Sequence, residues 1–263
     1  MTTLTNAVRD SSTMLRRDIR HAVRYPMVSL SGVMVPVLFL LLFAGVFGRT
    51  LSAGLGAVVP SGGGYIDYLT PGILLMTACS TAEITALNVS TDMTEGIIAR
   101  FRSMAITRTS VLTGQVLGGL VRAMISAMLV VALALALGFH PAATATEWIA
   151  ATAVFAMIAV AVTWVTVSFG LLAKTPAGAN SLSLLVVVAP FISSAFVPTA
   201  SMPAGVAWFA RNQPFTPIIQ TLRGLLTGAP IGDDATLAVA WCLVLSVFGY
   251  LWARSLYNRN RAA

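Results

Sequence analysis

Six long apolar stretches constrain the fold of this chain more than any other feature. A helix needs about 20 mostly apolar residues to cross the ~30 Å hydrocarbon core of a bilayer. The stretches that meet this length are 27–47, 66–90, 111–139, 148–173, 178–197 and 235–253. Continuous apolar runs exclude an outer-membrane barrel, whose strands alternate polar and apolar residues over about 10 positions. We therefore predict an all-α polytopic membrane protein with six transmembrane helices.

The composition agrees with a membrane protein and excludes other classes. Only 10% of the 263 residues are charged, 57% are hydrophobic and the mean hydropathy is +0.86. A soluble domain carries about 25% charged residues, so this chain has too few polar side chains to cover a water-facing surface. Cys79 and Cys242 lie in apolar runs and form no CxxC pair, so neither a disulfide framework nor a zinc site is indicated.

The basic residues predict the orientation. Lys and Arg resist translocation and gather in cytoplasmic loops. With the N-terminus inside, twelve of the 16 Lys and Arg residues fall on the cytoplasmic side. They are Arg9, Arg16, Arg17, Arg20, Arg24, Arg100, Arg102, Arg108, Lys174, Arg254, Arg259 and Arg261. Only Arg49, Arg211 and Arg223 fall outside, so both termini are predicted to be cytoplasmic.

Two amphipathic segments lie on the predicted cytoplasmic side. Residues 1–26 combine a narrow apolar stripe with arginines, which is typical of a helix lying in the membrane interface, although a solvated basic leader is the alternative. In the loop 91–110, Asp92 and Glu95 have the spacing of a capping box, and an apolar face opposite Arg100 and Arg102 follows. This short helix either lies on lipid or inserts into a groove of a cytoplasmic partner.

The segment 198–234, on the predicted outer side, is too apolar for a solvated loop and too rich in proline for one span. We predict two short helices, near 203–211 and 215–227. They pack against the outer ends of the spans and dip into the membrane as a re-entrant hairpin if protein buries their backbone.

Chemistry-bearing motifs are absent from the sequence. A P-loop needs Gly-Lys-Ser/Thr, and the single lysine, Lys174, follows Ala173. His21 and His140 are isolated, and no catalytic triad or metal-ligating cluster stands out. The sequence therefore predicts no enzyme activity, no cofactor in this chain and no nucleic-acid partner.

Two stretches resemble ABC-2 type permeases, and the daunorubicin-resistance type of drug exporter permease in particular. One is TDMTEGIIARFRSMAITRTSVLTGQVLGGLVR at 91–122. The other is APFISSAFVPTASMPAGVAWFARNQPFTPIIQTLRGLLTG at 189–228. Tyr25-Pro26 before the first span and YLTPGIL at 68–74 also fit, so the resemblance covers nearly the whole chain.

The resemblance implies a single ABC-2 transmembrane domain of the type V exporter kind over 1–263, in a bacterial cell membrane. It implies that a second permease copy or a homologue pairs with this chain, and that two separate ABC ATPase subunits bind ATP and Mg²⁺. The cytoplasmic loop helix would then be the coupling helix in the ATPase groove. Its docking residues would be Glu95, Ile98, Arg100, Phe101 and Arg102.

The resemblance also implies that spans 2 and 5 line a central substrate path. The candidate path residues are Met76, Thr77, Ser80, Glu83, Ser183, Val187, Phe191 and Ser194. For any one of them, ordinary helix packing is the competing interpretation. Glu83 lies ~10 Å inside the membrane, where a carboxylate is a functional hypothesis by default. We predict an ion pair of Glu83 with Arg122; the alternative is that Glu83 faces the path and binds a cationic substrate or a proton.

The expected function is the permease subunit of an ATP-driven exporter that moves hydrophobic or amphipathic drugs, antibiotics or lipids by alternating access. One alternative is a polysaccharide or glycolipid exporter permease, which would be expected to carry more aromatic residues along the path. Another is a proton-coupled secondary transporter, which would need a relay of membrane carboxylates and usually shows an inverted repeat. Only Glu83 lies deep, and no repeat is visible.

Overall fold

The computed structural model describes residues 26–46, 48, 64–94, 108–173 and 175–259, and within these ranges every regular element is a helix. The α-helices are α2 (Pro26–Gly45), α4 (Tyr65–Thr94), α6 (Arg108–Ala136), α7 (Ala145–Leu172), α8 (Pro176–Val188), α9 (Ala204–Asn212), α10 (Phe215–Thr227) and α11 (Asp234–Arg259). Two short 3₁₀ helices are η1 (Ala189–Ile192) and η2 (Thr199–Ser201). The predicted interfacial helix in residues 1–25 and the loop residues 95–107 lie outside the described part of the chain.

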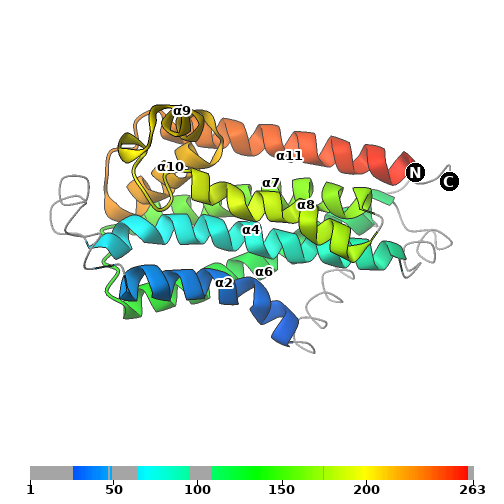
Figure 1. Ribbon diagram of the computed structural model, residues 1–263, viewed down its shortest axis with the longest axis horizontal. Helices are drawn as coiled ribbons and strands as arrows, with labels where there is room; N and C mark the ends of the chain where they lie inside the picture. The colour runs from blue at the N-terminus through cyan, green and yellow to red at the C-terminus, as the bar shows by residue number, and fades with distance from the viewer. Residues whose placement is uncertain (1–25, 47, 49–63, 95–107, 174, 260–263) are drawn as a thin grey trace.

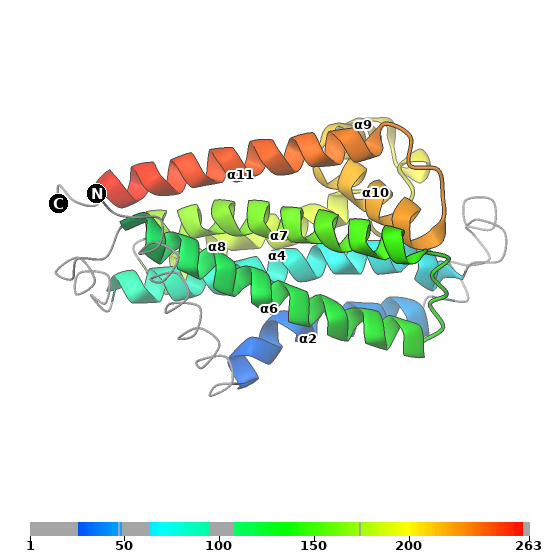
Figure 2. The ribbon, with the colours of Figure 1, turned by 180° about the vertical axis from the view of Figure 1, so that it is seen from behind.

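The long helices form one elongated bundle around α4 (Figures 1 and 2). Helix α4 packs against α2, α6, α7, α8 and α10, and α11 lies along α7. Helices α9 and α10 sit together at one end of the bundle, called the hairpin end from here on. Helix α11 finishes at the opposite end. The central position of α4 makes it the helix through which the other spans are connected.

Four described helices are long and apolar enough to cross a membrane: α4, the Leu112–Ala136 part of α6, α7 and α11. The other two predicted spans coincide with α2 and with α8 plus η1, but their apolar helices, Gly32–Gly45 and Pro176–Ile192, are shorter. The all-α, multi-pass membrane fold is therefore confirmed, while the count of six crossings stays a prediction.

The helix ends follow local signals in the sequence. Helix α7 begins with a capping box in which the Thr144 hydroxyl accepts from the Glu147 backbone and the Glu147 carboxylate accepts from the Thr144 backbone at 2.6 Å. Gly228 ends α10 with a positive φ of 72°, a conformation that glycine adopts without steric cost. The two hairpin helices, Ala204–Asn212 and Phe215–Thr227, agree closely with the predicted ranges.

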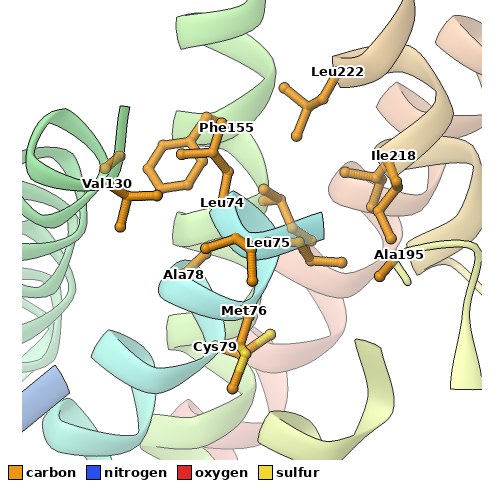
Figure 3. Close-up of a cluster of buried hydrophobic side chains, with 14 of the residues drawn as sticks. Leu74, Leu75, Met76, Ala78, Cys79, Val130, Phe155, Ala195, Ile218 and Leu222 are labelled. Atoms are coloured by element: carbon orange, nitrogen blue, oxygen red, sulfur yellow. The ribbon is translucent and has the colours of Figure 1, made fainter. Parts of the chain in front are cut away.

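Buried apolar side chains from α4, α6, α7 and α10 meet at the hairpin end of the bundle (Figure 3). Leu74 and Leu75 of α4 lie among Val130, Phe155 and Leu222, which come from three different helices. In contrast, α11 exposes large apolar side chains along its length, as a helix facing lipid does.

Close approach between helices depends on glycine at two crossings. A Cβ on Gly170 of α7 would lie 2.5 Å from the Ala86 carbonyl of α4. A Cβ on Gly249 of α11 would lie 2.8 Å from Val165 N of α7, and the Gly249 carbonyl accepts from the Ser168 hydroxyl at 3.1 Å. Because lipid offers no hydrophobic drive for helix association, such tight backbone contacts hold these helices together.

Candidate functional site

Helix α4 places polar side chains inside the bundle. Its apolar window has the lowest mean hydropathy of the four candidate spans, 1.3, yet 83% of it is buried by protein. The hydroxyls of Thr70, Thr77, Thr81 and Thr85 donate to carbonyls one turn earlier, at 2.7 to 3.2 Å. These bonds give each hydroxyl proton a partner within the helix, so burying the threonines leaves no unpaired donor.

One face of α4 is different. Met76, Ser80 and Glu83 fall on the same side of the helix, because each residue advances by about 100°. Helix α8, which packs on α4, buries a matching stripe of Ala179, Ser183 and Val187. We call the surface between these two stripes the α4–α8 seam; it contains five of the predicted path residues, Met76, Ser80, Glu83, Ser183 and Val187.

The seam contains buried hydroxyls without a hydrogen-bond partner in the part of the chain that the structure describes. They are Ser80 Oγ and Ser183 Oγ, and Ser194 Oγ, just beyond η1, behaves in the same way. A buried hydroxyl without a partner costs about 1–3 kcal/mol. A polar part of another molecule could satisfy these hydroxyls.

Thr77 and Phe191 belong elsewhere. The Thr77 hydroxyl donates to the Ile73 carbonyl at 2.7 Å. Thr81, one turn later, lies beside Gly32 of α2. The Phe191 ring stacks on Phe196 at 4.9 Å between centroids and meets Phe39 of α2 at 5.2 Å. The contacts of Phe191 therefore join α2 to the end of the fifth predicted span, and the path roles of Thr77 and Phe191 stay predictions.

The predicted ion pair of Glu83 with Arg122 is not seen among the described residues. Arg122 Nη2 instead donates to Thr85 Oγ1 at 3.3 Å. Glu83 and Thr85 are about 200° apart around α4, so the face that meets α6 carries Thr85 while half-buried Glu83 points away from it. The alternative interpretation, in which Glu83 faces the path, fits its position on the seam.

At the hairpin end the seam is closed by a network centred on Arg223 of α10, whose side chain is only 6% exposed. Its Nη2 donates to the Ser194 carbonyl at 2.9 Å and to the Tyr68 carbonyl at 3.2 Å. Its guanidinium carbon lies 3.7 Å from the centroid of the Tyr68 ring, a cation–π contact. Burial lowers the Arg223 pKa, against the opposing influence of Tyr68, but a guanidinium stays charged at any physiological pH.

Other bonds join the same pieces. The Tyr68 hydroxyl donates to the Ser194 carbonyl at 3.0 Å, and Gln213 Nε2 donates to the Ile192 carbonyl at 2.6 Å. A Cβ on Gly72 of α4 would lie 2.7 Å from the Ala195 carbonyl, so only glycine lets the residues after η1 lie against α4. The hairpin, the residues after η1 and α4 therefore form one closed cap over the seam.

Sequence reasoning missed two residues of this end. From the sequence alone, Arg223 is treated only as an outer basic residue, and no role is assigned to Asp67. Asp67 is 6% exposed, and its carboxylate accepts from Gly64 N at 2.9 Å and His140 N at 3.0 Å. In both cases the sequence contains a signal, namely a charged residue inside an otherwise apolar segment.

The predicted docking residues Glu95, Ile98, Arg100, Phe101 and Arg102 lie outside the described residues, but the helices on either side of them are tied together. Gln115 Nε2 of α6 donates to Asp92 Oδ2 of α4 at 2.9 Å. Helix α4 runs without interruption from Asp92 past the seam to Tyr68 at the hairpin end. A displacement of the loop would therefore reach both ends of α4.

Comparison with known proteins agrees with this architecture. The family model for ABC-2 type transporters matches residues 10–227. A daunorubicin resistance ABC transporter permease protein, DrrB1, from Streptomyces coeruleorubidus is 25% identical over 97% of this chain and 88% of its own length. A probable doxorubicin resistance ABC transporter permease protein, DrrC, from Mycobacterium tuberculosis is 22% identical over 83% of this chain and 78% of its own length. The chain belongs to the ABC-2 type transporter family, as a membrane-spanning permease.

Proposed function

We propose that this chain is the permease subunit of an ATP-driven exporter, and that the α4–α8 seam is its half of the substrate path. The observation that carries the proposal is that Ser80 on α4, Ser183 on α8 and Ser194 just beyond η1 have buried hydroxyls without a hydrogen-bond partner among the described residues. Buried polar groups normally find partners, so the hydroxyls on the seam are candidates for contact with a ligand.

The energy would come from two ABC ATPase subunits that bind ATP and Mg²⁺ and dock on residues 95–107. Those residues join α4 directly to α6, and the Asp92–Gln115 bond makes the two helix ends move as one. Tilting of this pair would change the fit of α4 against α8, which is a rigid-body route to alternating access. A second permease copy or a homologue would supply the other half of the path.

The cargo class follows from the lining. Met76 and Val187 offer apolar contact, the serines offer hydroxyls, and Glu83 offers a carboxylate at the far end from the cap. This combination suits an amphipathic molecule with a polar or cationic group, taken from the leaflet on the side of the termini. The names of the relatives, which refer to daunorubicin and doxorubicin resistance, support a drug-like cargo.

The decisive experiment is transport in vesicles that contain the permease with and without its ATPase partner. We expect ATP-dependent movement of an amphipathic dye only with the ATPase present. Ser183→Leu should reduce transport at least tenfold, because it fills the seam. Ser181→Leu is the matched control, since Ser181 is exposed on the other side of α8 and should change transport less than twofold.

Two outcomes would contradict the proposal. Transport driven by a proton gradient without the ATPase would indicate a secondary transporter. Equal activity of the Ser183 and Ser181 variants, both shown to be folded by size-exclusion chromatography, would remove the seam from the path.

A further inference from the structure

A cavity of about 480 Å³ lies away from the seam, at the hairpin end of the bundle. Its walls come from α6 and α7, with Met128 and Leu135 on one side and Trp148 and Phe155 on the other. Helix α10 closes its inner end with Leu222 and Leu226. We call this cavity the α6–α7 crevice; Figure 3 shows Phe155, Leu74 and Leu222 pointing toward the same space from three helices.

The crevice is apolar and opens toward the hydrocarbon. Met128 and Leu135 at its mouth are 63% and 47% exposed, as lipid-facing side chains are. The one hydroxyl in its lining, that of Thr152, donates to the Trp148 carbonyl at 2.8 Å and is therefore not offered to a ligand. Apart from the indole N–H of Trp148, the other side chains of the lining are hydrocarbon or thioether, and such a cavity favours an apolar occupant over ordered water.

Size and depth decide between the apolar occupants. The crevice is bounded by the last four turns of α6 and the first three of α7, so it lies within one leaflet. A helix from a second copy is about 10–12 Å across with its side chains, and a space of this volume would accept little more than one of its turns. A single hydrocarbon chain is thin enough to enter between α6 and α7 and is present in the bilayer at very high concentration.

We propose that the α6–α7 crevice binds one acyl chain of a phospholipid from the leaflet at the hairpin end. The bound chain contacts α10, whose neighbouring face carries Arg223 and the cap over the seam. Leu222 and Leu226 flank Arg223 in the sequence, so the chain supports the same helix that holds Tyr68 and Ser194.

The test uses the full chain in vesicles of phosphatidylcholine that contain a small fraction of the same lipid with a photoactivatable diazirine in one acyl chain. After illumination, mass spectrometry of the digested protein maps the adducts. We expect adducts on α6 and α7 at the crevice to exceed, at least fivefold per residue, those on the lipid-facing side of α11, such as Leu243 and Phe248.

Two variants locate the site. Ala132 lines the crevice and is exposed, so Ala132→Trp fills the mouth without disturbing the core. It should reduce the crevice adducts at least fivefold and leave those on α11 unchanged. Ala153→Trp is the matched control, because Ala153 is exposed on α7 outside the crevice. Adducts as dense on α11 as in the crevice, or unchanged in Ala132→Trp, would overturn the proposal; neither result bears on transport, since no ATPase or ATP is needed.

Discussion

Arg223 shows how a single buried side chain can join separate segments at the hairpin end. Its guanidinium binds two carbonyls from segments far apart in the sequence and lies on the Tyr68 ring. Lysine keeps the charge but not the planar set of donors, so it cannot bond both carbonyls in the same geometry. The role of Arg223 is therefore specific to arginine rather than to positive charge.

We expect Arg223→Lys to lower the free energy of unfolding by about 2 kcal/mol, because hydrogen bonds to charged groups contribute roughly 1.5–3 kcal/mol each. The measurement is thermal unfolding of the purified chain in detergent. Arg211→Lys on α9 is the control, since Arg211 is exposed and its variant should melt like the original protein. Equal melting of both variants would show that the Arg223 contacts do not stabilise the cap.

Glu83 and Arg122 give a second prediction at this scale. Because Arg122 contacts Thr85 while Glu83 lies on the seam, Glu83→Gln should fold normally and change which amphipathic dyes are transported. Arg122→Gln should instead reduce stability with no change in dye preference. A double-mutant cycle of the two substitutions measures their coupling, expected within about 0.5 kcal/mol of zero. A coupling above about 1 kcal/mol would instead support the predicted ion pair of Glu83 with Arg122.

At the scale of elements, hydropathy predicted the helices well and their contacts poorly. The spans were visible because a bilayer demands long apolar runs, and proline and glycine marked the hairpin helices. Which face of α4 meets which neighbour is not encoded in such local patterns. For this reason the bond of Arg122 to Thr85 and the partners of Asp67 and Arg223 could not be foreseen, while the path roles of Glu83 and Thr77 stay predictions.

The crossing of α11 with α7 provides a test of packing between elements. Gly249→Val should push α11 away from α7. Even a Cβ added at Gly249 would lie 2.8 Å from Trp164 Cβ and from Val165 N of α7. We expect the yield of monodisperse protein to fall severalfold. Gly45→Val, at a position with open space around it, should have little effect on yield. Normal yield of Gly249→Val would mean that the helices adjust without loss.

At the scale of the whole molecule, α4 connects the end where the ATPase is expected to dock with the hairpin end, where the cap lies. Helix α4 is bound to α6 through Asp92 and Gln115, beside the loop that is predicted to be cytoplasmic, and to the cap through Tyr68 and Gly72. Between these points it forms one wall of the seam. A force applied at the loop therefore has a continuous helical route to the cap. At 1.5 Å per residue, Tyr68 and Asp92 are about 36 Å apart along α4.

The route requires a partner that holds the loop, and Phe101 is the largest apolar side chain predicted for that contact. Phe101→Asp places a charge in an apolar groove and should abolish co-purification of the ATPase together with ATP-driven transport, while the permease itself still folds. Phe209→Asp is the control: Phe209 is 50% exposed on α9 at the hairpin end, far from any ATPase, and this variant should retain the complex. Full assembly of Phe101→Asp with an unchanged, transport-coupled ATPase rate would mean that the energy enters the permease at another site.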